Sequence, residues 1–184
     1  MEHQFPNGRI VRWQIGDITK FAADALVNAA NAALAGGGGV DGAIHRAGGP
    51  GIMKELDVIR AVQGGCPAGQ AVATSAGDLP ARFVFHAVGP IYRGGESGEA
   101  ELLRSCYETS LRMAAERQLR TIAFPSISTG AYGYPIREAA EIATGTVIEY
   151  LEQLSSSVQE VTFVLFGQRD YDEYTRVLRE RLKR

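Results

Sequence analysis

The chain has 184 residues, of which 45% are hydrophobic and 22% charged, and its formal net charge is −2. This composition is typical of one globular domain with a substantial core, and the charge excludes an electrostatic footprint for non-specific nucleic-acid binding. No apolar run has the length of a signal peptide or of a membrane span, so we expect a cytoplasmic protein without a membrane partner.

Predicted strands and helices alternate after residues 1–8, which we expect to be a flexible tail. Apolar patterns predict strands at Ile10–Ile15, Ala25–Asn28, Ala71–Ser75, Phe83–Val88, Thr121–Pro125 and Val161–Phe166. Helical spacing predicts a short helix over 51–62, amphipathic helices from Leu103 and from Ile136 to Leu154, and a last helix that includes Tyr171 and Leu182. Because several strands are apolar on both faces, we expect one α/β domain over residues 1–184 with a mixed, largely parallel sheet.

The most informative segment follows the second strand and contains four consecutive glycines, Gly36 to Gly39. Glycine has no side chain to bury and loses the most conformational freedom on folding, so this run indicates close approach of backbone N–H groups to an anion. Residues 37–42 satisfy G-x-G-x-x-G, but Gly36 lies eight residues after Asn28, and no acidic residue closes a strand about 20 residues later. This context argues against an NAD-dependent oxidoreductase.

Polar side chains lie on either side of the glycine run. The carboxamides of Asn28 and Asn31 match the paired hydroxyls of a ribose, and we favour a cap or turn for Asn28 and ligand contact for Asn31. Asp41 is a candidate to orient or deprotonate a water, with a helix N-cap as the alternative. His45, four residues later, shares that side of the helix and either supports the site or packs, as lone histidines more often do.

A second loop, Ser126–Pro135, precedes the helix that begins at Ile136. Ser128 to Ala131 offer another set of backbone donors at a strand end, and the ring of Tyr132 is suited to lie over a sugar. The loop lacks the lysine of G-x-x-x-x-G-K-[ST], which argues against ATP or GTP hydrolysis. Two glycine loops at one cleft suit a diphosphate with a group at each end, as in a nucleotide sugar.

Two further positions would complete such a ligand site. Asp17 is suited to accept a hydrogen bond from the exocyclic amine of a base, or to cap the short helix near Thr19. Phe166 ends the last strand and either stacks on a purine or belongs to the core. We interpret His86 as a core or strand-end residue, and we assign no metal because the three histidines have no ligand spacing.

The chain resembles a macrodomain of the MacroD type and, within it, the bacterial O-acetyl-ADP-ribose deacetylases. The resemblance extends over nearly the whole chain through GDIT, VNAAN, GGGGVDGAIHRAGGP, GGCPAGQA, GDLPARFVFHAVGPIYRGG, FPSISTGAYGYP and FVLFGQRDY. It implies a three-layer α/β/α fold around a six-stranded mixed sheet, with ADP-ribose in a cleft across the strand ends. The chain has Gly-Gln-Arg at residues 167–169, after the aromatic residue implied to stack on the adenine, where acidic residues are more usual in this family.

The resemblance also implies a role for each matching residue. The implied catalytic residues are Asp41, the supporting His45 and Asn31. Asn31 contacts the distal ribose, and Asn28 lies close behind Asn31. At the other end of the ligand, Asp17 and the backbone of Ile18 contact the adenine. The remaining positions implied to bind ADP-ribose, by stacking on the adenine or wrapping the diphosphate, are Phe166, Gly37, Gly38, Gly39, Val40, Ser128, Thr129, Gly130, Ala131 and Tyr132.

The implied reaction is hydrolysis of an ester on the distal ribose, without a metal or cofactor. A water oriented by Asp41 attacks the acetyl carbonyl of O-acetyl-ADP-ribose, whereas removal from ADP-ribosylated Asp or Glu breaks the bond between ribose and carboxylate. The expected partners are ADP-ribose, O-acetyl-ADP-ribose and mono-ADP-ribosylated proteins, without direct nucleic-acid binding. Two alternatives remain open: a module that binds ADP-ribose without turnover, and a regulator of an RNA-processing enzyme.

Overall fold

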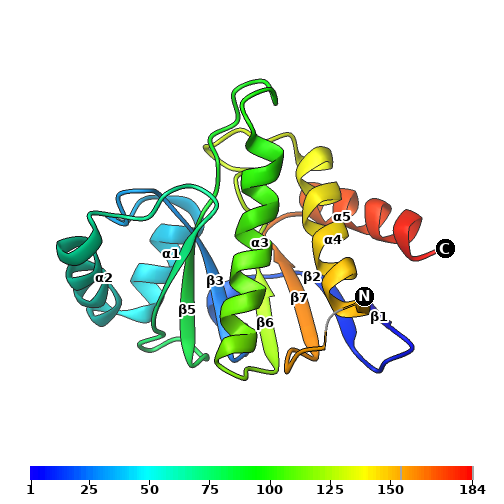
Figure 1. The fold of residues 1–184 in the computed structure, drawn as a ribbon, viewed down its shortest axis with the longest axis horizontal. Coiled ribbons are helices and arrows are strands. Elements are labelled where there is room, and N and C mark those ends of the chain that lie inside the picture. The colour runs from blue at the N-terminus through cyan, green and yellow to red at the C-terminus, as the bar shows by residue number, and fades with distance from the viewer. Residues whose placement is uncertain (154, 184) are drawn as a thin grey trace.

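The computed structural model describes residues 1–153 and 155–183, which form one seven-stranded sheet flanked by helices (Figure 1). The strands are β1 (Glu2–Gln4), β2 (Ile10–Ile15), β3 (Ala25–Ala30), β4 (Ala71–Ser75), β5 (Phe83–Val88), β6 (Thr121–Phe124) and β7 (Glu160–Leu165). Their order is β1-β2-β7-β6-β3-β5-β4; the two edge strands are antiparallel to their neighbours, and all other pairs are parallel. The mixed sheet is therefore confirmed, with seven strands where six were expected.

The seventh strand comes from residues 1–8, for which the expectation of a flexible tail was wrong. Glu2–Gln4 pair antiparallel with β2, and Phe5 is only 3% exposed because it joins the larger core. The side chain of Asn7 donates a hydrogen bond to the backbone oxygen of Leu151 at 2.7 Å. A three-residue strand is too short to show a periodic pattern, so the sequence did not reveal it.

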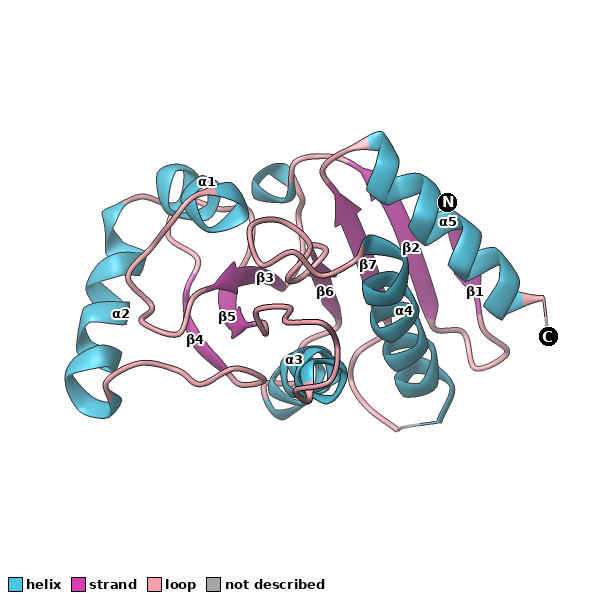
Figure 2. Cartoon of the chain, turned by 90° about the horizontal axis from the view of Figure 1, so that it is seen from above, coloured by secondary structure: helices cyan, strands magenta, loops and turns pink. Residues whose placement is uncertain are grey.

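Helices cover both faces of the sheet. They are α1 (Gly39–Gly48), α2 (Pro50–Gln63), α3 (Glu99–Glu116), α4 (Ile136–Gln153) and α5 (Gln168–Leu182), with a 3₁₀ helix η1 (Ile18–Lys20). Side chains of α1 and α2 form one core with the sheet, and those of α3, α4 and α5 form the larger one. Figure 2 shows α1 and α3 on opposite sides of the strands, which confirms the α/β/α layers. Leu154, part of the predicted apolar face of α4, lies outside the described residues.

Local signals in the sequence mark the ends of α2. Pro50 occupies its first turn, where the missing N–H and the fixed φ carry no cost, and Gly64 ends it in the left-handed conformation with φ of 80°. None of the described helices is both long enough and apolar enough to cross a membrane. The cytoplasmic location stays a prediction.

Two buried polar residues lie side by side on the sheet face under α1 and α2. Leu26 and Ala30 of β3 belong to the core under α1 and α2, and Asn28 lies between them with the same orientation. His86 of β5 is the register partner of Asn28 in the parallel pairing. Both side chains therefore point toward the layer that contains α1.

The five parallel strands end along one edge of the sheet. Because neighbouring strands are parallel, the segments that follow β2, β7, β6, β3 and β5 lie along this edge in that order. The loops after β6 and β3, which are the two glycine loops of the sequence, are therefore neighbours. In open α/β sheets, ligands bind outside the carboxyl ends of the strands.

We predict that Phe5→Ala lowers the free energy of unfolding by about 3–5 kcal/mol, because a buried ring is replaced by a cavity. Urea denaturation of both proteins measures this change. Gln4→Ala, at the exposed neighbouring residue, serves as the control and should change stability by less than about 0.5 kcal/mol. A Phe5→Ala protein as stable as the wild type would show that the N-terminal segment is a tail after all.

Candidate functional site

A cavity of about 310 Å³ opens at the strand ends between the two glycine loops. Its lining residues are Ala29, Ala30, Asn31, Gly37, Gly38, Gly39, Val40, Asp41, Gly89, Ser126, Ile127, Ser128, Gly130, Ala131 and Tyr132. Among these described residues, Asp41 alone carries a charge. An anionic ligand in this cavity would therefore be held by backbone N–H groups, as expected from the absence of a basic patch in the sequence.

The first glycine loop leads directly into the N-terminus of α1. Gly38 is the N-cap and makes no side-chain capping bond, and Gly39, Val40 and Asp41 form the first turn. N–H groups in the first turn of a helix have no intrahelical acceptor and carry the positive end of the helix dipole. Gly36 and Gly39 have φ of 82° and 57°, which explains the need for glycine there. The run thus places N–H groups that have no intrahelical acceptor at the lining of the cavity, where they are suited to bind an anion.

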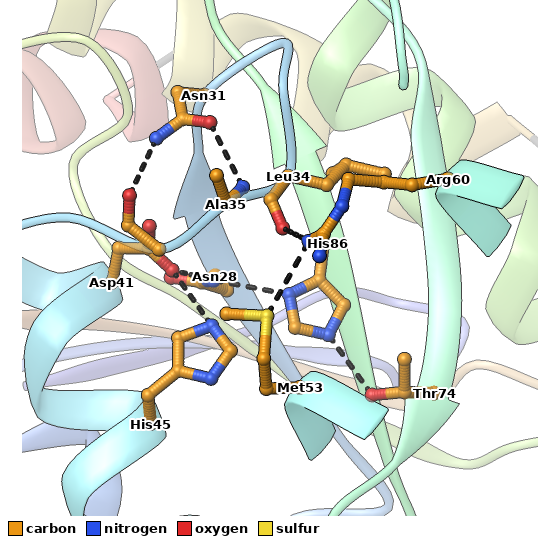
Figure 3. Close-up of polar contacts among 11 residues, drawn as sticks. Asn28, Asn31, Leu34, Ala35, Asp41, His45, Met53, Arg60, Thr74 and His86 are labelled. Carbon is orange, nitrogen blue, oxygen red and sulfur yellow. Dashed lines mark hydrogen bonds and ion pairs between the residues drawn. The ribbon is translucent and has the colours of Figure 1, made fainter. Parts of the chain in front are cut away.

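Asp41 is inside the helix, so its interpretation as the N-cap was wrong. Its carboxylate is buried, with Oδ1 accepting a hydrogen bond from Asn28 Nδ2 at 2.8 Å and lying 3.3 Å from His45 Nε2 (Figure 3). Oδ2 lies on the side of Gly37, where a β-carbon would be 3.5 Å from it and 3.7 Å from Asn31 Nδ2. One oxygen is held by the protein, and the other borders the cavity beside Asn31.

Asn28 is neither a cap nor a turn residue, because β3 continues beyond it to Ala30. Its side chain is fully buried and donates hydrogen bonds to Asp41 Oδ1 and to His86 Nδ1, at 2.8 and 3.1 Å. It is not among the residues that line the cavity, and its direct contact with a ligand stays a prediction. Its position close behind the site agrees with what the resemblance implied.

His86 is a fully buried residue of β5, as expected, and it also belongs to this polar group. Nε2 lies 2.9 Å from Thr74 Oγ1, and the ring lies 6.1 Å from that of His45 in a stacked orientation. Burial, with a smaller contribution from His45, lowers the pKa of His86 to about 3, so the ring is neutral at pH 7. Sequence reasoning missed this role because it depends on which residues of three strands lie side by side.

Asn31 lines the cavity and also braces its own loop. Nδ2 donates to the backbone oxygen of Gly36 at 2.8 Å, and Oδ1 accepts from the N–H of Ala35 at 3.3 Å. The carboxamide therefore fixes the turn that presents the glycine run, which is the role sequence analysis gave as the alternative. Its contact with a ribose stays a prediction.

The second loop contributes a strained backbone and a buried hydroxyl. Ser128 has φ of 67°, which is uncommon for a residue with a side chain, and such strain clusters at ligand sites. Its Oγ is buried, finds no hydrogen-bond partner among the described residues, and would lie 2.1 Å from a β-carbon at Gly89. Gly89, which sequence analysis did not single out, thus gives the hydroxyl its space. Thr129 bonds Ser126 instead and does not line the cavity.

The residues expected at the adenine lie along the same edge but outside the cavity. Phe166 is 86% exposed, so the core alternative was wrong for it. Asp17 caps η1, because Oδ1 accepts from Thr19 Oγ1 at 2.7 Å and from Thr19 N at 3.0 Å, and these bonds lower the pKa of Asp17. Ile18 is buried. The cap role is confirmed, and contact of Asp17 and Ile18 with a base stays a prediction.

The arrangement combines an anion site with a carboxylate placed to orient a water. Residues of the two loops line the cavity and their backbone N–H groups are candidate donors to an anion, Tyr132 is at its wall, and Phe166 is exposed further along the edge. The described residues form no group of three or more His, Cys, Asp or Glu side chains suited to a metal ion. Such a site can bind a diphosphate and present a bond near Asp41 to water.

Comparison with known proteins agrees with this geometry. A macro domain-containing protein of Caldanaerobacter subterraneus is 58% identical and covers 90% of this chain and 93% of its own length. The O-acetyl-ADP-ribose deacetylase of Escherichia coli K12 is 52% identical, covering 89% and 92%. A mutant of the Oceanobacillus iheyensis macrodomain, solved with ADPR, has a TM-score of 0.95 at 42% identity and covers 100% of this chain and 99% of its own. Residues 27–143, more than half of the sequence, match the family model of the Macro domain, and the chain belongs to this family.

Proposed function

We propose that this protein binds ADP-ribose across the strand ends and hydrolyses esters on its distal ribose. The substrates are O-acetyl-ADP-ribose and mono-ADP-ribose attached to acidic side chains. The observation that carries the proposal is the buried Asp41 carboxylate, which borders the cavity at the N-terminus of α1. Relatives named O-acetyl-ADP-ribose deacetylase and a similar macrodomain solved with ADPR support it.

The strand order supports one orientation of the ligand. The adenine lies beside Phe166 and Asp17, after β7 and β2, and the diphosphate lies between the loops after β6 and β3. The distal ribose then reaches Asn31 and Asp41 under Tyr132. Three strand steps separate β2 from β3, or about 14 Å at roughly 4.8 Å per step, a distance that an extended nucleotide diphosphate can span.

The reaction uses the two oxygens of Asp41 differently. Oδ1 is occupied by the hydrogen bond from Asn28, which leaves Oδ2 to accept a hydrogen bond from a water in the cavity. The water oxygen attacks the acetyl carbonyl as one of its protons moves to Oδ2. The bond between the carbonyl carbon and the ribose oxygen then breaks as that proton passes from Oδ2 to the ribose oxygen, which gives ADP-ribose and acetic acid, present as acetate at pH 7. For an ADP-ribosylated carboxylate, the bond between ribose and carboxylate breaks instead. The backbone donors fix the diphosphate and so orient the ester.

Two other roles give different experimental results. A module that only binds ADP-ribose needs the two loops but not the carboxylate of Asp41. A regulator of an RNA-processing enzyme acts through a protein surface, and that role stays a prediction. Turnover by the isolated protein separates the hydrolase from both.

We predict that Asp41→Asn lowers the turnover of O-acetyl-ADP-ribose by about 100-fold or more, as expected when a positioned base is lost. Asparagine keeps the acceptor for Asn28 and nearly the same shape, so the dissociation constant for ADP-ribose should change little. Acetate release measures turnover, and isothermal titration calorimetry measures binding. The same pair of proteins is assayed on a mono-ADP-ribosylated carboxylate substrate.

The control is Asp172→Asn, which removes an equal charge from the exposed surface of α5 and should leave turnover unchanged. Unchanged turnover in Asp41→Asn would refute the role of Asp41. No turnover in the wild-type protein, with ADP-ribose still bound, would favour the binding module.

We predict that Phe166→Ala weakens ADP-ribose binding by roughly 5- to 150-fold, because stacking of a base on an aromatic ring contributes about 1–3 kcal/mol. Its high exposure means that the free energy of unfolding should change by less than about 0.5 kcal/mol. Val62→Ala, at another exposed apolar residue, on α2, should leave binding unchanged. Equal affinity of Phe166→Ala and wild type would place the adenine elsewhere.

A further inference from the structure

A line of buried polar side chains extends from Asp41 across three strands of the sheet (Figure 3). Asn28 on β3 contacts Asp41 of α1, His86 on β5 contacts Asn28, and Thr74 on β4 contacts His86. All four are at most 5% exposed, and the three sheet residues do not line the cavity. The surrounding core under α1 and α2 is apolar, so this line is an exception that needs a reason.

The hydrogen bonds of this line determine the direction of each donor. Thr74 Oγ1 donates its hydrogen to the backbone oxygen of Ser75 at 2.9 Å, so toward His86 it acts as an acceptor. The hydrogen of the neutral imidazole is therefore on Nε2, and Nδ1 is an acceptor facing Asn28. The two hydrogens of Asn28 Nδ2 then go to His86 Nδ1 and to Asp41 Oδ1.

This pattern permits only one orientation of the Asn28 carboxamide. If the amide were rotated by 180°, Oδ1 would face two other acceptors, His86 Nδ1 and Asp41 Oδ1. The observed orientation leaves Asn28 Oδ1 without a hydrogen-bond partner among the described residues, which is a cost for a buried acceptor. The hydrogen bond with His86 thus fixes the Asn28 carboxamide so that its NH₂ group faces Asp41. The carboxamide oxygen is left without a partner as a result.

Asn28 is the residue through which the sheet holds the carboxylate. His45 Nε2 is 3.3 Å from the same Asp41 oxygen, but within the described part of the chain neither ring nitrogen of His45 makes a hydrogen bond. With Oδ1 bound by Asn28, Oδ2 is left on the side of Gly37 and the cavity. The orientation of the carboxylate therefore depends on residues up to two strands away.

We propose that Thr74, His86 and Asn28 are positioning residues that hold Asp41 with Oδ2 toward the cavity. The proposal rests on the catalytic role proposed for Asp41, and it assigns to Asn28 the support of the carboxylate in place of contact with the ligand. A purely structural role would be met equally well by apolar residues, which would leave no buried acceptor unpaired.

Thr74→Val tests the proposal at the residue farthest from the ligand. Valine keeps the shape of threonine but removes the acceptor for His86 Nε2, which favours the tautomer with hydrogen on Nδ1. That hydrogen faces the amide of Asn28 and favours the rotated amide, whose oxygen opposes Asp41. We predict that kcat for O-acetyl-ADP-ribose falls about tenfold or more, the usual size for partners behind directly acting residues.

Two controls separate positioning from a general loss of structure. Thr74→Ser keeps the hydroxyl and should keep kcat within about twofold of wild type, and all variants should bind ADP-ribose within about twofold. In the Asp41→Asn background, Thr74→Val should cause no further loss of kcat, because its effect passes through Asp41. A fall of equal size in that background would overturn the proposal, as would a wild-type kcat in Thr74→Val.

The outcomes distinguish this proposal from the proposed function. Full turnover in Asp41→Asn contradicts the role of Asp41 itself, whereas loss in Asp41→Asn with full turnover in Thr74→Val contradicts only the positioning line. If Thr74→Val does not fold, His86→Asn replaces it. Asparagine at this position keeps an acceptor near the place of Nδ1, whereas leucine has none. His86→Asn should therefore retain more turnover than His86→Leu, and equal turnover of these two variants would overturn the proposal.

A spectroscopic measurement tests the donor directions without a change in activity. In ¹⁵N-labelled wild-type protein at pH 7, His86 should carry hydrogen on Nε2 and none on Nδ1. In Thr74→Val, signal should move toward the Nδ1 tautomer, and in Thr74→Ser it should not. Hydrogen on Nδ1 in the wild-type protein would show that Asn28 is not held as assigned and would overturn the proposal.

Discussion

The parallel register of β3 between β6 and β5 is the constraint on which the site depends. Pairing with β6 brings the two glycine loops together, and pairing with β5 sets Asn28 opposite His86. Because side chains alternate along a strand, a shift of one residue would turn Asn28 to the other face and away from Asp41. The same register leaves Gly89 at the end of β5, where it gives space to the hydroxyl of Ser128. The backbone hydrogen bonds of β3 with β6 and β5 thus place both the two glycine loops and the Asn28 side chain that contacts Asp41.

The cleft is suited to an anion although the lining residues described here include no cation. Donor groups come from the first turn of α1 and from the second loop, so the positive potential is fixed by the backbone and does not depend on a flexible side chain. This arrangement also allows Asp41 to lie close to a diphosphate, because the backbone N–H donors offset the negative charges of the carboxylate and of the diphosphate. In the proposed function, the N-terminus of α1 binds the phosphates and also carries Asp41, so the distance from the phosphates to the carboxylate is fixed by one helix.

Much of the fold could be predicted from the sequence because its strands are short apolar runs between clear turn signals. The bounds expected for β2, β4 and β5 are those observed, and Asp41 and three glycines of the run line the cavity. Residues that act through register could not be found in this way. His86 has the sequence context of a core residue, and only the pairing of β3, β5 and β4 shows what it contacts. The short β1 lacked a periodic signal and was missed. Ser128 was a candidate from the sequence, but no local signal predicted its positive φ.

Hydrolysis of O-acetyl-ADP-ribose in ¹⁸O-labelled water shows whether the water attacks the acetyl carbonyl, the step assigned to Asp41. If the water near Asp41 attacks the acetyl carbonyl, mass spectrometry will find one ¹⁸O atom in each released acetate. Acetate without the label, or no release of acetate by protein that binds ADP-ribose, would contradict this mechanism.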